Sequence, residues 1–311
     1  MNYPLVSVIC LCYNQAKYIV ESLESVKNQT YQNLEIIIWD DASKDNSVEI
    51  IETWISQNPE LKITFTKNKE NKGICKTLNE AQSLTKGKYI QLLALDDILL
   101  PNKISQHVEI LENSSPKEAL VFTDAYLIDS ESKMYQNRFI AYHKRYYTLH
   151  SGNFFEDLLK ENYIPAMTIL FKKDCLIEIG SWDETLVYED FDILLRLAKK
   201  YDFIFDDKPS AKYRFHSENS HKKLNKNMQR SLFKIYLKYI NYNDFVNRFL
   251  LKTVISLYEE NNLQDENNAY FAINKPRGFF ENWIAKNKSL KTYYFFKRLT
   301  RLKNAIVYFN K

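Results

Sequence analysis

Two carboxylates stand side by side at Asp96 and Asp97, directly after the apolar run 89–95 (YIQLLAL). Carboxylate oxygens at the end of a buried strand suit Mg²⁺ or Mn²⁺, hard cations that also bridge phosphate groups. Aspartate is equally at home in solvated turns and before helices, and Pro101 favours a helix start just beyond the pair. Taken alone, the pair therefore fits a metal-diphosphate site and an ordinary turn about equally well.

Two further aspartates stand where an element ends or begins. Asp41 follows the apolar run 34–39 (LEIIIW), and its carboxylate can accept hydrogen bonds from a nucleotide base or ribose. Asp190, in VYEDFD, opens a helical pattern, where the helix dipole keeps a carboxylate ionised and able to act as a general base. The simpler interpretations are strand-end polarity for Asp41 and a favourable first-turn acid for Asp190.

The segment YRFH places two basic side chains close together, at Arg214 and His216. The histidine is a candidate ligand for a metal or a phosphate, and the guanidinium is a candidate clamp for a diphosphate. A lone histidine is more often a partly buried structural group.

The elements that must position these residues follow from the hydrophobic pattern. Short apolar runs rich in β-branched residues predict buried strands, and apolar residues at helical spacing between them predict amphipathic helices. The predicted strands are 6–11, 34–39, 61–66, 89–95 and 119–124. Such alternation predicts an open, doubly wound α/β sheet, mostly parallel, with ligands beyond the carboxyl ends of its strands.

The pattern weakens after residue 124. Residues 125–185 are aromatic-rich and show no clear period, so we expect an acceptor-facing insertion there. Phe191, Leu194 and Leu195 then restore a helical face, and from about residue 225 the chain is helical and basic. The four cysteines lack any CxxC pair and are expected to be buried, reduced thiols.

Composition excludes several classes of protein. Only 5 glycines occur in 311 residues, so a glycine-rich phosphate loop, which nucleotidyltransferases generally need, is not expected. The N-terminus lacks the pattern of a secretory signal, and no apolar run is long enough to span a membrane, which predicts a cytoplasmic protein. Residues 221–311 carry 18 basic and 6 acidic side chains, whereas the preceding residues carry 25 and 33. This asymmetry predicts an acidic, metal-using body and a basic tail that meets an anionic partner.

In order and spacing, these features resemble the family 2 glycosyltransferases, which have the GT-A fold. The resemblance covers about residues 4–220. It rests on the opening segment VSVICLCYNQAKYIVESLESVKNQTYQNLEIIIWDDASKDNS, on NKGICKTLNEA, on KGKYIQLLALDDILLPNKI, on IGSWDETLVYEDFDILLRLA and on YRFH. Many members carry an acid where this chain has Ala94, so its metal site is expected to have one carboxylate fewer.

The resemblance implies a role for individual residues. The residues implied for nucleotide binding are Leu11, Tyr13, Asp41, Lys76 and Asp96. Those implied for Mn²⁺ or Mg²⁺ are Asp97 as the principal ligand, Asp96 and His216, with Arg214 at the diphosphate. Trp182 and Glu189 would meet the acceptor, and Asp190 would be the base of an inverting, single-displacement reaction.

The implied organisation is a GT-A domain over residues 1–220 and a basic helical extension over 221–311. About 1–124 would form the nucleotide-binding half and about 125–220 the acceptor-binding half. The implied function is transfer of a sugar, with UDP-sugar as the expected donor, to a glycan or lipid-linked acceptor in surface polysaccharide biosynthesis. The alternatives are a degenerate sugar-nucleotide-binding protein and a nucleotidyltransferase.

The basic tail has two interpretations of its own. The stretch 289–309 (SLKTYYFFKRLTRLKNAIVYF) interleaves cations with aromatic residues, as a helix lying on anionic lipid does, which predicts a peripheral place on the inner face of the cell membrane. Packing on the catalytic body is the other interpretation. Nucleic acid is not an expected partner, although the positive charge makes binding to it testable.

Overall fold

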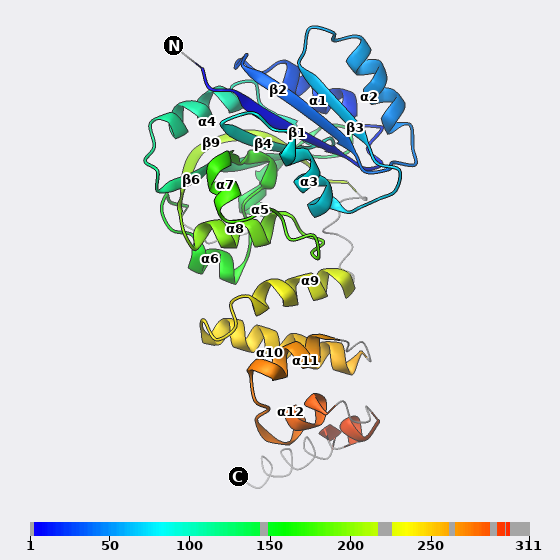
Figure 1. Cartoon of the computed structure of the whole chain (residues 1–311), viewed down its shortest axis with the longest axis vertical. Coiled ribbons are helices and arrows are strands. Elements are labelled where there is room, and N and C mark those ends of the chain that lie inside the picture. Colours follow the sequence, from blue (N-terminus) through cyan, green and yellow to red (C-terminus); the bar gives the residue numbers. More distant parts are fainter. Residues whose placement is uncertain are drawn as a thin grey trace. The chain divides into compact units, whose positions relative to one another are not determined.

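The computed structural model of the chain divides into two compact units, residues 1–223 and 224–311, each of which is described by itself (Figure 1). The structure describes residues 3–143, 149–216, 226–260, 265–286, 291–295 and 297–298. Every residue to which the sequence assigned a role in nucleotide, metal or acceptor binding or in catalysis lies in the described part of the first unit.

The first unit begins with alternating strands and helices. These elements are β1 (Val6–Cys12), α1 (Ile19–Lys27), β2 (Leu34–Asp40), α2 (Ser47–Ser56), β3 (Ile63–Lys67), α3 (Ile74–Ser83) and β4 (Tyr89–Ala94). Strand β1 lies between β2 and β4, β3 follows β2, and all three pairings are parallel. Parallel strands end at the same edge of a sheet, so the loops after β1, β2 and β4 meet there.

The apolar pattern of these strands has a simple cause, because helices cover the sheet and bury it. Successive side chains of a strand point to opposite faces. On one face, Val8 and Cys10 of β1 belong to the same buried cluster as Leu23 of α1 and Trp54 of α2. On the other face, Ile9 is fully buried as well. All four cysteines are buried and unpaired, as the sequence predicted.

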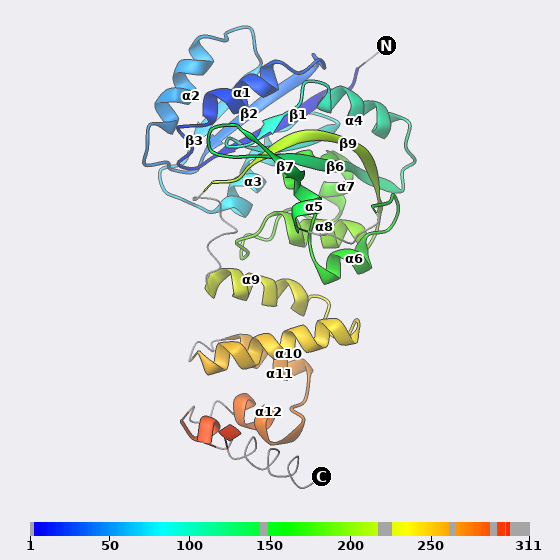
Figure 2. The same ribbon diagram turned by 180° about the vertical axis from the view of Figure 1, so that it is seen from behind.

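The chain then completes the sheet with shorter and less regular elements. They are β5 (Ile98–Leu99), α4 (Lys103–Glu112), β6 (Glu118–Ile128), β7 (Met134–Arg138), α5 (Phe139–His143), α6 (Phe155–Lys160), a 3₁₀ turn (Ala166–Thr168), β8 (Leu170–Lys172), α7 (Lys173–Glu178), α8 (Asp190–Ala198) and β9 (Asp202–Arg214). The strand order is β3-β2-β1-β4-β8-β6-β9-β5, and β7 pairs with β6 (Figures 1 and 2).

Four strands of this sheet, β5, β7, β8 and β9, were not among those predicted. Strand β8 lies within the stretch that we expected to be an insertion, and it pairs antiparallel with both β4 and β6. Strand β9 runs parallel to β6, and its last residues lie beside the turn that follows β4, because β5 pairs with Lys212 and Ala211. The sheet is therefore parallel over its first four strands and mixed beyond β4.

The second unit is helical in its described part, with α9 (Lys226–Leu237), α10 (Asp244–Glu259), α11 (Asp265–Ile273) and α12 (Gly278–Ala285). Helix α10 starts where the Asn243 side chain accepts a hydrogen bond from the backbone N–H of Val246, an N-cap of the usual kind. Leu250, Val254 and Leu257 form its buried face. Among the described helices of both units, none has the length and apolar content that a membrane span requires.

Candidate active site

The loops after β1 and β2 are fastened to each other at the edge of the sheet. Asp40 accepts a hydrogen bond from the backbone N–H of Ser43 at 2.9 Å and another from its hydroxyl. The Ser43 hydroxyl oxygen in turn accepts from the backbone N–H of Asn14 at 2.9 Å, and the Asn14 side chain accepts from Lys44 N at 2.7 Å. Asp40 therefore stabilises the turn after β2, whereas its neighbour Asp41 contacts the segment between β3 and α3.

Asp41 holds the segment that leads into α3. Its Oδ1 accepts from Asn68 Nδ2 at 2.7 Å and from Lys72 N at 2.9 Å, and its Oδ2 accepts from Gly73 N at 3.0 Å. The side chain is only 7% exposed, and Gly73 has a φ of 84°, a left-handed conformation that favours glycine. The carboxylate that is predicted to bind the nucleotide base thus also holds the segment that leads into α3.

The Asp96–Asp97 pair lies in the turn directly after β4. Asp97 Oδ1 accepts a hydrogen bond from the backbone N–H of Arg214 at 2.9 Å, and Asp96 Oδ2 lies 3.0 Å from His216 Nε2. Burial raises the pKa of Asp97 well above its ordinary value, and the adjacent Asp96 raises it further. Two adjacent, nearly buried carboxylates form a site whose negative charge a cation would stabilise.

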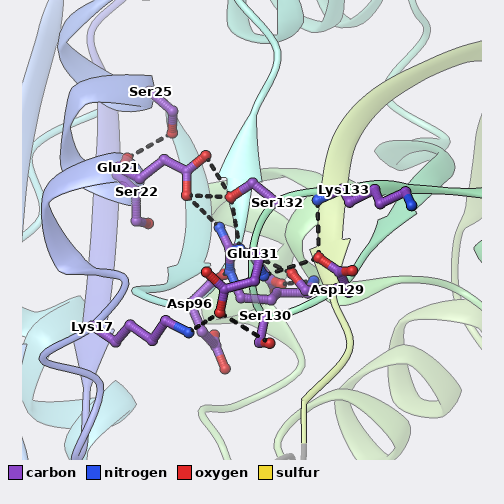
Figure 3. Close-up of polar contacts among 12 residues, drawn as sticks. Lys17, Glu21, Ser22, Ser25, Asp96, Asp129, Ser130, Glu131, Ser132 and Lys133 are labelled. Atoms are coloured by element: carbon purple, nitrogen blue, oxygen red, sulfur yellow. Dashed lines mark hydrogen bonds and ion pairs between the residues drawn. The ribbon is translucent and has the colours of Figure 1, made fainter.

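Arg214 connects this turn to α1 and to the turn between β6 and β7, whose residues Glu21, Asp129 and Ser132 are labelled in Figure 3. Its guanidinium is 1% exposed. Nε donates to the Asp96 carbonyl at 2.8 Å, Nη2 to the Glu21 carboxylate of α1 at 2.6 Å, and Nη1 to Ser132 Oγ at 2.9 Å and the Asp129 carbonyl at 3.1 Å. We expected this guanidinium to clamp the diphosphate. The structure instead directs its donors to protein oxygens, which favours a positioning role for Arg214.

Aromatic stacking completes the surroundings of Arg214. The ring of Tyr18 lies 4.6 Å from the guanidinium carbon, a cation–π distance, and 5.1 Å from the ring of His216. Lys17 also forms an ion pair with Glu131 in the turn between β6 and β7. The start of α1, the β6–β7 turn and the end of β9 therefore meet beside Asp96 (Figure 3).

The second acidic pair, Glu189 and Asp190, lies at the start of α8. Asn162 Nδ2 donates to Asp190 Oδ2 at 2.8 Å, and the backbone N–H of Phe191 donates to Asp190 Oδ1 at 2.7 Å. Burial raises the pKa of Asp190, whereas these hydrogen bonds lower it. Burial, followed by the charge of Asp190, raises the pKa of Glu189 to about 8.

Tyr213 links the two acidic pairs, and the sequence did not lead us to it. Its pKa is raised first by burial and then by the negative charges of Asp97, Asp96, Asp190 and Glu189. Carboxylates more than ninety positions apart in the chain therefore act on one phenol. The signal was present in the segment YRFH, where Tyr213 directly precedes Arg214.

The other residues with a predicted role differ in their exposure to solvent. Leu11 pairs with Trp39 and Ala94 where the three strands end, and Tyr13 just beyond it is 47% exposed. Lys76 is exposed on α3. Trp182 is buried, and its backbone N–H and C=O are both held by the Asn79 amide, at 2.9 Å each. A role for Trp182 at the acceptor thus stays a prediction, with the indole inside the protein.

The side chains at the turn after β4 supply some, but not all, of the ligands that a divalent cation needs. The described residues contain no ready-made group of three or more His, Cys, Asp and Glu side chains for a metal ion. Asp96, Asp97 and His216 nevertheless offer carboxylate and imidazole donors, and Mg²⁺ and Mn²⁺ accept such donors while keeping water and phosphate ligands. A cation here would need the phosphates of a bound nucleotide to complete its coordination.

Comparison with known proteins shows which family the chain is similar to. The family model of glycosyl transferase family 2 matches residues 7–180. An uncharacterized glycosyltransferase of Methanocaldococcus jannaschii is 30% identical over 225 residues, which are 71% of this chain and 74% of that protein. Another, from Rickettsia felis, is 29% identical over 282 residues, 90% of this chain but 43% of that protein. The chain spans less than half the length of this and two other Rickettsia relatives.

Solved structures share the fold at low sequence identity. The Staphylococcus aureus protein TarS, residues 1–349 in complex with UDP-GlcNAc, has a TM-score of 0.62 at 16% identity, covering 96% of this chain and 92% of that one. The mannosyltransferase PcManGT of Pyrobaculum calidifontis, in complex with GDP-Man and Mn²⁺, has a TM-score of 0.57 at 15% identity, covering 95% and 87%. These likenesses confirm the α/β fold predicted from the sequence.

Proposed function

The chain belongs to glycosyl transferase family 2 and has the GT-A fold, and from this membership we propose that it is an inverting, nucleotide-sugar-dependent glycosyltransferase. The observation that carries the proposal is the buried pair Asp96 and Asp97 in the turn after β4, with His216 Nε2 3.0 Å from Asp96 Oδ2. This pair and the second acidic pair, Glu189 and Asp190, match the two tasks of sugar transfer, which are stabilisation of a diphosphate leaving group and removal of a proton.

The proposed reaction is a single displacement. The acceptor oxygen bonds to the anomeric carbon while the bond from that carbon to the diphosphate oxygen breaks, and the electron pair stays on the nucleoside diphosphate. The acceptor proton passes to the carboxylate of Asp190. Because attack and departure occur on opposite faces of the carbon, its configuration inverts.

At the other end of the reacting bond, Asp97, Asp96 and His216 would hold Mn²⁺ or Mg²⁺. When bound, the cation neutralises the negative charge that develops on the departing diphosphate. Arg214 keeps Asp96 and Asp97 in place through their backbone and side-chain oxygens. Asp41 would accept a hydrogen bond from the nucleotide base, beside Tyr13 and Leu11.

A UDP-sugar is the proposed donor. A complex of TarS with UDP-GlcNAc supports this choice, and a complex of PcManGT with GDP-Man makes GDP-sugars the alternative to test. The proposed acceptor is a hydroxyl of a glycan or of a lipid-linked sugar in surface polysaccharide biosynthesis. The exposed cations and aromatic side chains of the second unit support a reaction site at the inner face of the cell membrane.

The decisive experiment measures thermal stabilisation by a panel of nucleotide sugars with and without Mn²⁺, followed by a transfer assay with the donor that binds. Selective stabilisation by UDP-sugars, dependent on Mn²⁺, is the expected result, because a ligand that binds only the folded protein raises its unfolding temperature. Stabilisation by no nucleotide sugar would refute the donor assignment. Binding without turnover would favour the degenerate sugar-nucleotide-binding protein.

A further inference from the structure

The Asn162 side chain reaches the proposed base from a separate segment of the chain. Asn162 lies two residues beyond α6, in a stretch that links this helix to the sheet, and α6 packs on α8 (Figure 1). Its Nδ2 donates to Asp190 Oδ2 at 2.8 Å, and its Oδ1 accepts from the backbone N–H of Ile164 at 3.1 Å. The contact with Ile164 fixes the amide orientation, since an N–H donor requires the oxygen on that side.

The segment that carries Asn162 is well anchored. Tyr163 and Ile164 are each 2% exposed, and Pro165 follows them. Thr168, in the next turn, donates its hydroxyl to the Thr123 carbonyl of β6 at 3.0 Å. Because this segment is already ordered, the Asn162 side chain loses little conformational entropy when it donates to Asp190, as effective positioning requires.

The groups around Asp190 make this donor important. The groups whose pKa its charge raises include Tyr188 and Glu189 beside it, Cys75 of α3 and Tyr213 of β9. None of these four is a cation. Hydrogen-bond donation from Asn162 and from the backbone N–H of Phe191 therefore counteracts burial, which favours the neutral acid.

We propose that Asn162 is a positioning residue that orients the Asp190 carboxylate toward the acceptor hydroxyl and maintains it in the ionised form. The proposal rests on the proposed role of Asp190 as the base. Asp190 Oδ1 accepts from the backbone N–H of Phe191 at the start of α8, and Oδ2 accepts from Asn162. A carboxylate oxygen has two lone pairs, which leaves each oxygen capable of accepting a further proton or hydrogen bond.

The chain offers a matched control in Asn153. Its Oδ1 accepts from the backbone N–H of Phe155 at 3.0 Å, and its Nδ2 donates to the Ala198 carbonyl at the other end of α8 at 2.8 Å. Asn153 thus repeats the arrangement of Asn162, an amide fixed by the backbone two residues later that donates to α8. Asn153 differs from Asn162 in its acceptor, which is a backbone carbonyl and not the carboxylate of the proposed base.

The test is the pH profile of kcat for Asn162→Ala and Asn162→Asp, with Asn153→Ala as the control. Loss of the donor should move the acid limb to higher pH, and the second carboxylate of Asn162→Asp should move it further. Each unit of displacement lowers kcat about tenfold below the limb, with recovery at higher pH and an unchanged KM for the donor. Asn153→Ala should alter stability without moving the limb. Where the alanine variant fails to fold, Asn162→Asp carries the test, because it removes the amide donor and keeps an oxygen that accepts from the backbone N–H of Ile164.

Two outcomes separate this proposal from the function on which it rests. An unmoved acid limb in both Asn162 variants, with Asp190→Asn inactive, would overturn the role of Asn162 and leave Asp190 as the base. Near-normal transfer by Asp190→Asn would overturn the base assignment itself. If both assignments hold, Asn162→Ala should cause no further loss in an Asp190→Asn background, because effects that act through one group do not add.

Discussion

The backbone N–H of Arg214 donates to the carboxylate of Asp97 at 2.9 Å, and Nε of the same residue donates to the Asp96 carbonyl at 2.8 Å. The last residue of β9 thereby fixes both residues of the turn after β4. Its guanidinium also binds Glu21 and Ser132, so α1 and the β6–β7 turn share this anchor.

Replacing Arg214 with Met should therefore both destabilise the protein and weaken the proposed cation site. Loss of the buried guanidinium leaves the Asp96 and Asp129 carbonyls without their donor, and an unsatisfied buried acceptor costs about 1–3 kcal/mol. We expect a lower unfolding temperature, and a higher Mn²⁺ concentration for nucleotide-dependent stabilisation. The control is Lys17→Met, which breaks an exposed ion pair with Glu131 and should leave the unfolding temperature nearly unchanged. A normal Mn²⁺ requirement in a folded Arg214 variant would contradict the positioning role.

Replacing Asp190 with Asn should abolish most of the turnover while leaving donor binding intact. The amide has nearly the shape of the carboxylate but cannot take the acceptor proton, and general base catalysis contributes about 10²–10⁴-fold. Steady-state kinetics and donor-induced thermal stabilisation measure the two properties separately. Loss of donor binding together with turnover would show that Asp190 acts on the nucleotide instead.

Much of the fold was predictable because β1, β2 and β4 are buried on both faces and appear as continuous apolar runs. Strands β8 and β9 were not. Strand β8 has three residues, too few to show a period. The middle of β9 contains Asp206, Asp207, Lys208 and Pro209, which as a sequence indicate a turn, and the register with β6 shifts there.

The site was predictable to a similar extent. Asp96, Asp97 and Asp190 stood out because acidic residues followed or began a clear element. Tyr213 and Asn162 gave no such signal. Their importance depends on contacts between distant segments, such as the 2.8 Å hydrogen bond from Asn162 to Asp190, which no local pattern contains.

Replacing Asp41 with Asn should loosen the loop that leads into α3. Three N–H donors converge on the Asp41 carboxylate, and an amide can accept at one oxygen only, so one donor would face an NH₂ group. An unsatisfied buried donor costs about 1–3 kcal/mol. We expect a lower unfolding temperature and weaker stabilisation by nucleotide sugars. The comparison variant Glu52→Gln changes an exposed carboxylate paired with Lys67 and should alter neither property. Unchanged nucleotide binding in Asp41→Asn would remove Asp41 from the donor site.

Glu189 should make the stability of the protein depend on pH. Its pKa is raised to about 8 in the folded state, so the folded protein favours the neutral acid. This contribution to stability is complete below the ordinary pKa of glutamate and is lost as pH rises toward about 8. Glu189→Gln cannot ionise, so its unfolding temperature should exceed that of the parent at pH 9 and match it near pH 4. Parallel stability curves for the two proteins would contradict this assignment.

The second unit should bind anionic lipid. Its exposed side chains on and after α11 include the apolar Ile273, Phe279, Tyr294 and Phe295 and the cations Lys275, Arg277, Lys286, Lys291 and Arg298. The rest of the predicted interfacial stretch 289–309 lies outside the described residues. Aromatic side chains beside cations suit the interface of an anionic bilayer, where each cation contributes about 1 kcal/mol.

Sedimentation with vesicles tests this surface directly. The protein should pellet with vesicles that contain phosphatidylserine and remain in solution with purely zwitterionic ones. Lys275→Glu with Arg277→Glu should reduce pelleting strongly, because the change reverses two charges near the lipid. Lys44→Glu with Lys62→Glu makes the same change on exposed positions of the first unit and should leave pelleting unaffected. Two results would exclude a lipid-binding surface here: equal pelleting with both kinds of vesicle, or an equal decrease in both double variants. Either result would favour packing of this segment within the protein.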